Sequence, residues 1–190
     1  VSKSHSSNLN AIKVINSFCM NNLSYKVSLG ISNSYMRLVH DALDAGIPLD
    51  YVQDEFNLLA IKKFSYLLKC HELGIDTQIY SPLARGLLTG KYNIYNMPCF
   101  SKSDNRSEYF SSLGTNDASM LHSLDLLSNA LNISMFESLF NIYSTIGFID
   151  ACVIGVKSCQ QLDNYLNLRP VNIEEDPNYV RIMSLLEDSK

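Results

Sequence analysis

Long hydrophobic runs and an excess of basic charge are both absent from this 190-residue chain. No apolar stretch reaches the ~18–20 residues that cross a bilayer, so no membrane segment is predicted. The opening residues VSKSHSS contain no apolar core of a secretory signal, and we expect a cytoplasmic protein. With 15 Lys and Arg against 19 Asp and Glu, the net charge of −4 argues against nucleic acid or an anionic membrane as partner.

Several short motifs are missing as well. The five cysteines include no C-x-x-C pair, which argues against both a disulfide framework and a zinc site. Cys70-His71-Glu72 begins like a zinc-binding helix, but Ile75 stands where the second histidine is needed. There is no G-x-G-x-x-G, so a Rossmann dinucleotide fold is excluded.

The composition is that of a folded protein, with 46% hydrophobic and 18% charged residues, and its length predicts a single domain over residues 1–190. Short apolar strands alternate with helical periodicity, a pattern typical of βα units with a parallel sheet. Such sheets bind ligands at the carboxyl ends of their strands. Helices are predicted over 8–22, 34–45, 61–73, 117–131, 134–148, 159–167 and 178–187, strands over 26–31, 51–56, 78–81 and 151–155, and an irregular connection over 82–116. In the helix over 134–148, Ser134 and Glu137 have the spacing of a capping box.

Four motifs stand at the ends of these strands. They are LGISN at 29–33, VQDEFNLL at 52–59, YSPLARGLLTGKY at 80–92, and VIGVKS at 153–158 with QL at 161–162. In this order they resemble motifs of the fifth to eighth barrel strands of the aldo-keto reductases, over nearly the whole chain. The resemblance implies an α/β fold of the (β/α)8 TIM-barrel type, of which this chain has about four carboxyl-terminal βα units.

The resemblance also implies a site for NADP(H). Ser32, Asn33 and Gln53 would hydrogen-bond the nicotinamide carboxamide, because amides and hydroxyls both donate and accept. Tyr80 would stack on the nicotinamide ring. The pyrophosphate path would be lined by Ser81, Leu83 and Lys91, with Arg106 as a further source of charge, and the adenosine 2′-phosphate and adenine would meet Gly155, Lys157, Ser158, Gln161 and Asn164. Lys157 with Ser158 favours NADP(H) over NAD(H), since a 2′-phosphate needs a cation.

The sequence departs from the family pattern in ways that concern the adenine end most. Asp54 replaces an Asn after Gln53, and Tyr165 replaces an Asn near the adenine. Ile154 and Cys159 stand where prolines are expected.

The family's catalytic Asp, Tyr, Lys and His lie on the first four strands, none of which we find here. A full barrel needs about 250 residues. We therefore expect the amino-terminal half to be absent, the isolated chain to be inactive, and its sheet edges and an apolar face to be exposed and prone to self-association. The expected function is the cofactor-binding portion of a reductase that converts aldehydes or ketones to alcohols. The alternative is a non-catalytic cofactor-binding pseudoenzyme or regulatory subunit, like the potassium-channel β branch of the family.

Each candidate residue also has a structural interpretation. Gln53 would satisfy a polar group inside the barrel, Tyr80 would be an ordinary strand aromatic, and Ser32-Asn33 would be a helix N-cap. Lys157 would be a solvated surface lysine and Arg106 a structural or exposed residue. His40 and His71, within predicted helices, are expected to have surface or packing roles.

Overall fold

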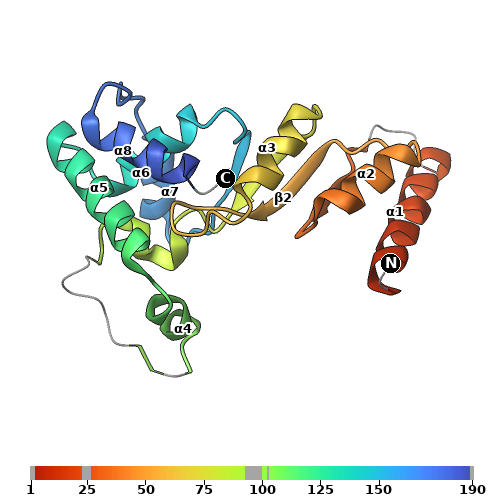
Figure 1. Ribbon diagram of the computed structural model, residues 1–190, viewed down its shortest axis with the longest axis horizontal. Helices are drawn as coiled ribbons and strands as arrows, with labels where there is room; N and C mark the ends of the chain where they lie inside the picture. The colour runs from red at the N-terminus through yellow and green to blue at the C-terminus, as the bar shows by residue number, and fades with distance from the viewer. Residues whose placement is uncertain (1–2, 23–26, 93–99, 102, 189–190) are drawn as a thin grey trace. The chain divides into compact units, whose positions relative to one another are not determined.

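The computed structural model describes residues 3–22, 27–92, 100–101 and 103–188, and within them helices and strands alternate as predicted (Figure 1). The elements in chain order are α1 (Lys3–Asn22), β1 (Gly30–Ser32), α2 (Met36–Asp44), β2 (Tyr51–Glu55), α3 (Phe64–Glu72), β3 (Asp76–Tyr80), the 3-10 helix η1 (Ala84–Thr89), α4 (Asn105–Ser111), α5 (Thr115–Leu131), α6 (Met135–Thr145), β4 (Ala151–Val153), α7 (Cys159–Leu166) and α8 (Pro177–Glu187).

These elements divide into two compact units, each described here by itself. The first unit comprises the described residues of Val1–Glu55, Lys63–Tyr80 and Phe148–Cys152; the second comprises those of Phe56–Lys62, Ser81–Gly147 and Val153–Lys190. A single domain over 1–190 stays a prediction. No helix in the described residues is long and apolar enough to cross a membrane.

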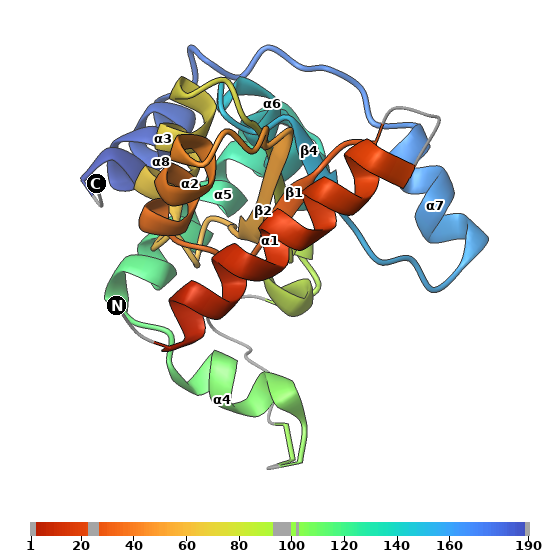
Figure 2. The same ribbon diagram turned by 90° about the vertical axis from the view of Figure 1, so that its right-hand side faces the viewer.

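A four-stranded sheet with the order β1-β2-β3-β4 organises the first unit. The β1–β2 and β2–β3 pairs are parallel, which confirms the predicted βα pattern. Helices α1 and α2 pack against each other (Figure 1), and Figure 2 shows α1 in front of the sheet. Ile12 of α1, Leu38 of α2 and Ile47 after α2 are buried in one hydrophobic cluster. Helix α3 packs on β2 and β3.

The two faces of this sheet differ in character because side chains alternate along a strand. On β2, Val52 and Asp54 are buried, whereas Gln53 on the opposite face is only partly buried. Strand β3 repeats the pattern, and Gln78 and Tyr80 lie on the less buried face. That face therefore carries polar side chains on β2 and β3, among them Gln53 and Tyr80, two of the predicted site residues.

Two aspartates, each directly before a strand, bind a residue of the neighbouring strand segment through both their backbone N–H and their carboxylate. The Asp50 N–H donates to the Leu29 carbonyl at 2.8 Å, and its carboxylate accepts from the Leu29 N–H at 2.6 Å. Asp150 makes the same pair of bonds with Thr77, at 3.1 and 2.6 Å. These reciprocal bonds fix the register at which β1 and β3 meet their neighbours.

The second unit is mainly helical. Helix α5 packs against both α6 and α8, and the three lie together in Figure 1. Its core contains Leu124, Leu127, Leu139, Ile142 and Ile182, none of them exposed. The predicted capping box is confirmed, since the Ser134 Oγ accepts from the Glu137 N–H at 3.1 Å and Glu137 accepts from the Ser134 N–H at 2.9 Å.

Several helices and strands begin or end at other residues than the hydrophobic periodicity predicts. Helix α3 begins at Phe64 instead of 61, because Asn57 accepts the Leu59 N–H at 2.9 Å and holds a turn there. Strand β1 is confined to Gly30–Ser32 and β4 ends at Val153, two residues early. Strand β3 starts at Asp76, which pairs with Tyr51, and helix α1 starts at Lys3 instead of 8. The segment predicted as irregular contains η1 and α4, while its residues 93–99 and 102, like Lys26 of the first predicted strand, lie outside the described residues.

Candidate functional site

A row of polar side chains crosses the sheet of the first unit, from the last residue of β1 through the middle residues of β2 and β3. The register pairs Ser32 with Gln53, and Gln53 with Gln78. The Ser32 hydroxyl donates to the Gln53 Oε1 at 3.4 Å, and the Gln53 amide donates to the Gln78 Oε1 at 3.2 Å. Gln53 therefore has polar partners on both neighbouring strands, as the structural interpretation of this residue expects.

Asn33 extends this row into the loop after β1. Its backbone is left-handed, with φ of 52°, and its N–H donates to the Gln53 carbonyl at 2.9 Å. Its side-chain amide donates to the Ser32 hydroxyl at 3.4 Å and accepts from the Tyr80 hydroxyl at 2.5 Å. Ser32 and Asn33 are not the N-cap of the next helix, because Tyr35 holds that position, so that structural interpretation was wrong.

Tyr80 connects β3 to this group. Partial burial, followed by the charges of Glu55 and Asp54, raises the pKa of Tyr80 above its ordinary value, and the bond to Asn33 opposes this only in part. This shift favours the protonated phenol, which is the form that donates to Asn33. Ser32, Asn33, Gln53, Gln78 and Tyr80 form what we call the strand-end cluster.

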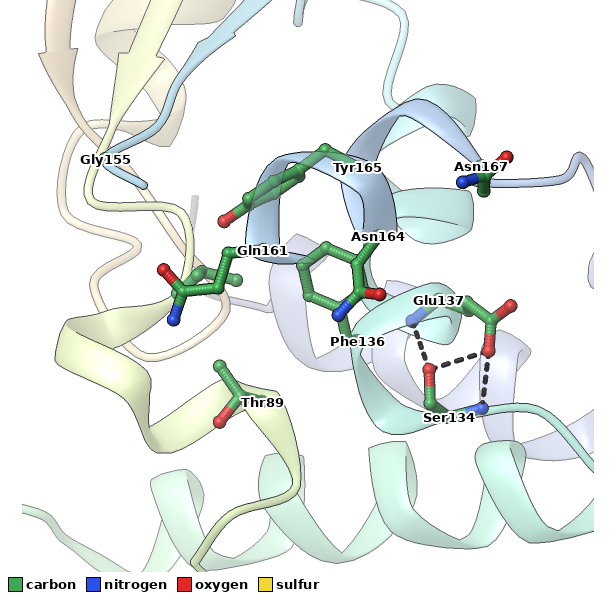
Figure 3. Close-up of a pocket in the computed structure, with 10 residues that line it drawn as sticks. Thr89, Ser134, Phe136, Glu137, Gly155, Gln161, Asn164, Tyr165 and Asn167 are labelled. Atoms are coloured by element: carbon green, nitrogen blue, oxygen red, sulfur yellow. Dashed lines mark hydrogen bonds between the residues drawn. The ribbon is translucent and has the colours of Figure 1, made fainter. Parts of the chain in front are cut away.

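The second unit contains a cavity of about 530 Å³ beside helix α7 (Figure 3). In the figure, Gln161, Asn164 and Tyr165 project from α7 across from Thr89 of η1 and from the start of α6. Aromatic rings form part of its wall, since the Phe136 and Tyr165 ring centroids are 4.9 Å apart at an interplanar angle of 70°. The cavity is lined by Leu83, Thr89, Ser134, Phe136, Glu137, Gly155, Gln161, Asn164, Tyr165 and Asn167.

A second hollow of about 520 Å³ in the same unit is rich in cationic side chains. Arg85, Lys91, Arg106 and Lys157 line it together with Ser81. Arg106 donates to both carboxylate oxygens of Asp104, at 2.9 and 2.6 Å, and this pairing lowers the Asp104 pKa to about 2. Arg106 thus has the structural partner that its structural interpretation expects, which reduces the charge it offers to a ligand.

The turn before α7 is ordered by its own side chains. The Ser158 Oγ caps the helix by accepting from the Gln161 N–H at 3.2 Å. The Gln161 Oε1 accepts in return from the Lys157 N–H at 2.8 Å. Lys157 and Gly155 are exposed at this turn. The exposure of Lys157 agrees with its structural interpretation as a solvated surface lysine, and it also leaves the residue accessible to a ligand.

The predicted residues are thus gathered in three places. Ser32, Asn33, Gln53 and Tyr80 meet in the strand-end cluster; Leu83, Gly155, Gln161 and Asn164 line the cavity; and Ser81, Lys91 and Lys157 line the cationic hollow, which also includes Leu83, Gly155 and Gln161. Ser158 lines neither space and is the N-cap of α7. No group of three or more His, Cys, Asp or Glu side chains in the described part of the chain is arranged to hold a metal ion.

Sequence reasoning missed several lining residues. Gln78 was available from the alternation that also places Tyr80 on its face of β3. Phe136 and Glu137 come from the start of α6, which is distant in sequence from the strand ends. The capping box marks Glu137 as a helix-start residue but gives no sign that it lines a cavity, and no local motif marks Phe136. His71, predicted to have a surface or packing role, lies 3.6 Å from Asp150, and both side chains are partly exposed.

Comparison with known proteins agrees with these features. Residues 27–174 match the aldo/keto reductase family, and the chain belongs to this family. It is 40% identical over 77 residues to the chloroplastic pyridoxal reductase of Arabidopsis thaliana, which covers 37% of this chain and 21% of the relative.

Solved structures show the same fold. A glycerol dehydrogenase of Gluconobacter oxydans superposes with a TM-score of 0.72 at 17% identity, over 95% of this chain and 54% of that protein. The holo form of an aldo-keto reductase of Bacillus halodurans gives 0.61 at 15% identity, over 90% and 54%. The predicted α/β fold of TIM-barrel type is confirmed, and the chain spans about half the length of these structures.

Proposed function

We propose that this chain supplies the cofactor-binding part of an NADP(H)-dependent reductase that converts aldehydes or ketones to alcohols. The observation that carries the proposal is the strand-end cluster, in which amide and hydroxyl groups from three strands meet and which reaches the carboxyl ends of β1 and β3 at Ser32 and Tyr80. Ligands bind at this end in proteins of this fold. Family membership and the aldehyde in the name of the Arabidopsis relative support the same reaction class.

The residues of the strand-end cluster fit a nicotinamide carboxamide. An amide side chain has two N–H donors and an oxygen with two lone pairs. Gln53 uses one donor and one lone pair within the cluster, and Asn33 does the same. Each therefore has a donor and an acceptor left for a ligand, and both Ser32 and Asn33 are exposed. In the proposal Tyr80 packs against the nicotinamide ring, and the bound cofactor supplies the hydride for the carbonyl carbon.

The second unit, taken by itself, has groups suited to the phosphates and the adenine of such a cofactor. A phosphate group needs cations and N–H donors, and Lys91, Arg85 and Lys157 line the hollow. Adenine needs a flat apolar wall with polar groups at its rim, which Phe136 and Tyr165 provide beside Asn164 in the cavity. Glu137 brings a carboxylate to the same cavity, so we assign the 2′-phosphate to Lys157 and the cationic hollow, away from Glu137.

The experiment is a fluorescence titration of the purified chain with NADPH and with NADH, with circular dichroism as a check of folding. We expect NADPH to bind more tightly, and Lys157→Ala to weaken NADPH about tenfold with little effect on NADH. Lys69→Ala, at another exposed lysine, is the matched control and should change neither. A folded chain that binds neither nucleotide would contradict the proposal.

Turnover separates the enzyme from the non-catalytic alternative. We propose that the isolated chain binds NADPH without reducing a carbonyl, because the family's catalytic Asp, Tyr, Lys and His have no counterparts among the residues matched here. Reduction of pyridoxal by the pure chain would contradict this. An upstream coding sequence that carries those four residues would favour the reductase, and a longer protein without them would favour a regulatory cofactor-binding subunit.

Two further proposals concern partners and location. Strands β1 and β4 end the four-stranded order, so we propose self-association through these edges, to be tested by sedimentation of the purified chain over a range of concentrations. A cytoplasmic location remains our proposal, although the Arabidopsis relative is named as chloroplastic. Fluorescent tagging of the full coding sequence tests it.

A further inference from the structure

A buried ion pair lies directly behind the strand-end cluster. Asp54 follows Gln53 on β2 and points to the opposite face, where it is only 2% exposed. The Lys63 ammonium at the start of α3 lies 2.8 Å from the Asp54 Oδ2. The same ammonium donates to the Ser34 carbonyl at 2.6 Å. One cation thus joins the end of β2, the start of α3 and the loop after β1.

This cation binds the backbone of the residue that follows Asn33. Asn33 has a left-handed backbone, a conformation that asparagine adopts more readily than most other non-glycine residues. The Asn33 N–H is bound to the Gln53 carbonyl, and Lys63 binds the carbonyl of the following residue. The loop is therefore held on both sides of Asn33, whose amide accepts the Tyr80 hydroxyl.

We propose that Asp54 and Lys63 are a positioning pair that orients Asn33, and through it Tyr80, for the nicotinamide end of the cofactor. This inference rests on the proposed function. Neither residue touches the cluster's ligand-facing groups, so both act through Asn33. Asp54 stands where the family motif has a neutral Asn, and Lys63 gives the buried carboxylate its counter-charge.

The two partners differ in burial, which predicts unequal effects. The Asp54 side chain is 4% exposed and that of Lys63 is 34% exposed. Lys63→Met leaves a buried carboxylate without its counter-charge and releases Ser34, although Asp54 keeps the Glu55 N–H as a donor. Asp54→Asn leaves a cation that water can reach and that still binds Ser34. Lys63→Met should therefore be the more damaging change, and adding Asp54→Asn to it should restore part of the loss.

The test compares two ligands. NADPH needs both ends of the site, whereas 2′,5′-ADP needs only the phosphate and adenine end. We expect Lys63→Met to weaken NADPH about tenfold and to leave 2′,5′-ADP within about twofold of wild type. Asp54→Asn should weaken NADPH less, and the double variant should lie between the single variants. Lys62→Met, at the exposed neighbouring lysine, is the control and should alter neither ligand.

Each outcome decides a separate question. If Lys63→Met weakens the binding of NADPH and of 2′,5′-ADP equally, the pair has a general structural role. If it leaves NADPH affinity unchanged, the pair has no role in binding. Either result overturns the positioning role and leaves the proposed function standing. A wild-type chain that binds neither ligand would overturn the proposed function and this inference with it. If Lys63→Met fails to fold, Lys63→Arg replaces it, because arginine keeps the positive charge but places its N–H donors differently. For the proposal to stand, Lys63→Arg must weaken the binding of NADPH more than that of 2′,5′-ADP.

Discussion

The Tyr80 hydroxyl donates to the Asn33 side-chain oxygen at 2.5 Å, across 47 residues of sequence. This bond joins the end of β3 to the loop after β1, with β2 between them. It uses the only proton of the phenol, so Tyr80 presents its ring to a ligand and its hydroxyl to the protein. That division suits a residue proposed to stack on a nicotinamide ring.

The raised pKa of Tyr80 gives a first prediction. Partial burial favours the neutral phenol, so its stabilising contribution is present below the ordinary tyrosine pKa of 10.0 and is lost as pH rises through the folded-state value. Phenolate formation is followed by ultraviolet absorbance in the wild type and in Tyr80→Phe, and the difference between the two titrations reports Tyr80. Its midpoint should lie above pH 10.0. A midpoint at or below that value would show that Tyr80 is not held as described.

Asn33 allows conformation and hydrogen bonding to be separated. Asn33→Gly keeps the left-handed backbone without cost from a side chain but removes the acceptor for Tyr80. Asn33→Ala removes the acceptor and adds strain of about 1 kcal/mol. We expect both to weaken NADPH about tenfold, and only Asn33→Ala to lower the urea midpoint clearly. Full NADPH affinity in Asn33→Gly would show that the amide does not bind the cofactor.

The strand-end cluster shows how far sequence reasoning reached. Ser32, Asn33, Gln53 and Tyr80 were predicted from motifs that stand at strand ends, and parallel pairing does bring them together. Their bonds to one another were not predictable, because they depend on the register of three strands and on the left-handed turn at Asn33.

Long-range packing set the other limit. Nothing local in the sequence joins Lys63 to Asp54 and Ser34, which come together only when α3 packs behind the sheet. Similarly, Phe136 lines the cavity because α6 and α7 meet there, and no motif near a strand end predicts that Phe136 has this position. By contrast, the Ser134–Glu137 capping box is a local pattern, and it was predictable with its partners.

Gly30 gives a test of the close approach between β1 and β2. A Cβ atom built there would overlap the Tyr51 ring and lie 2.9 Å from the Tyr51 carbonyl oxygen. Because Gly30 pairs with Tyr51 in the register, the strands would have to separate. Gly30→Ala should lower the free energy of unfolding by about 1–3 kcal/mol, measured by urea denaturation.

The matched control is Gly147→Ala, where a Cβ would meet nothing within 4 Å. This change should leave stability within about 0.5 kcal/mol of wild type. Equal stability of the two variants would mean that β1 is not held against Tyr51.

The capping box predicts an acid-dependent contribution to stability. The Ser134 hydroxyl, donating at 2.7 Å, and then the Ser134 N–H hold the pKa of Glu137 below its ordinary value of 4.5. A lowered carboxyl pKa stabilises the fold above the unfolded-state value, and this stabilisation is lost as pH falls through the folded-state value. Because Gln can still accept the Ser134 N–H, Glu137→Gln should cost only the contribution of the charge, about 0.3–1 kcal/mol at neutral pH, and the difference from wild type should shrink steadily below pH 4.5. Urea denaturation across that range measures it, with Glu174→Gln at an exposed position as the control. A penalty for Glu137→Gln that stays constant into acid would mean that the carboxylate charge contributes nothing to the cap.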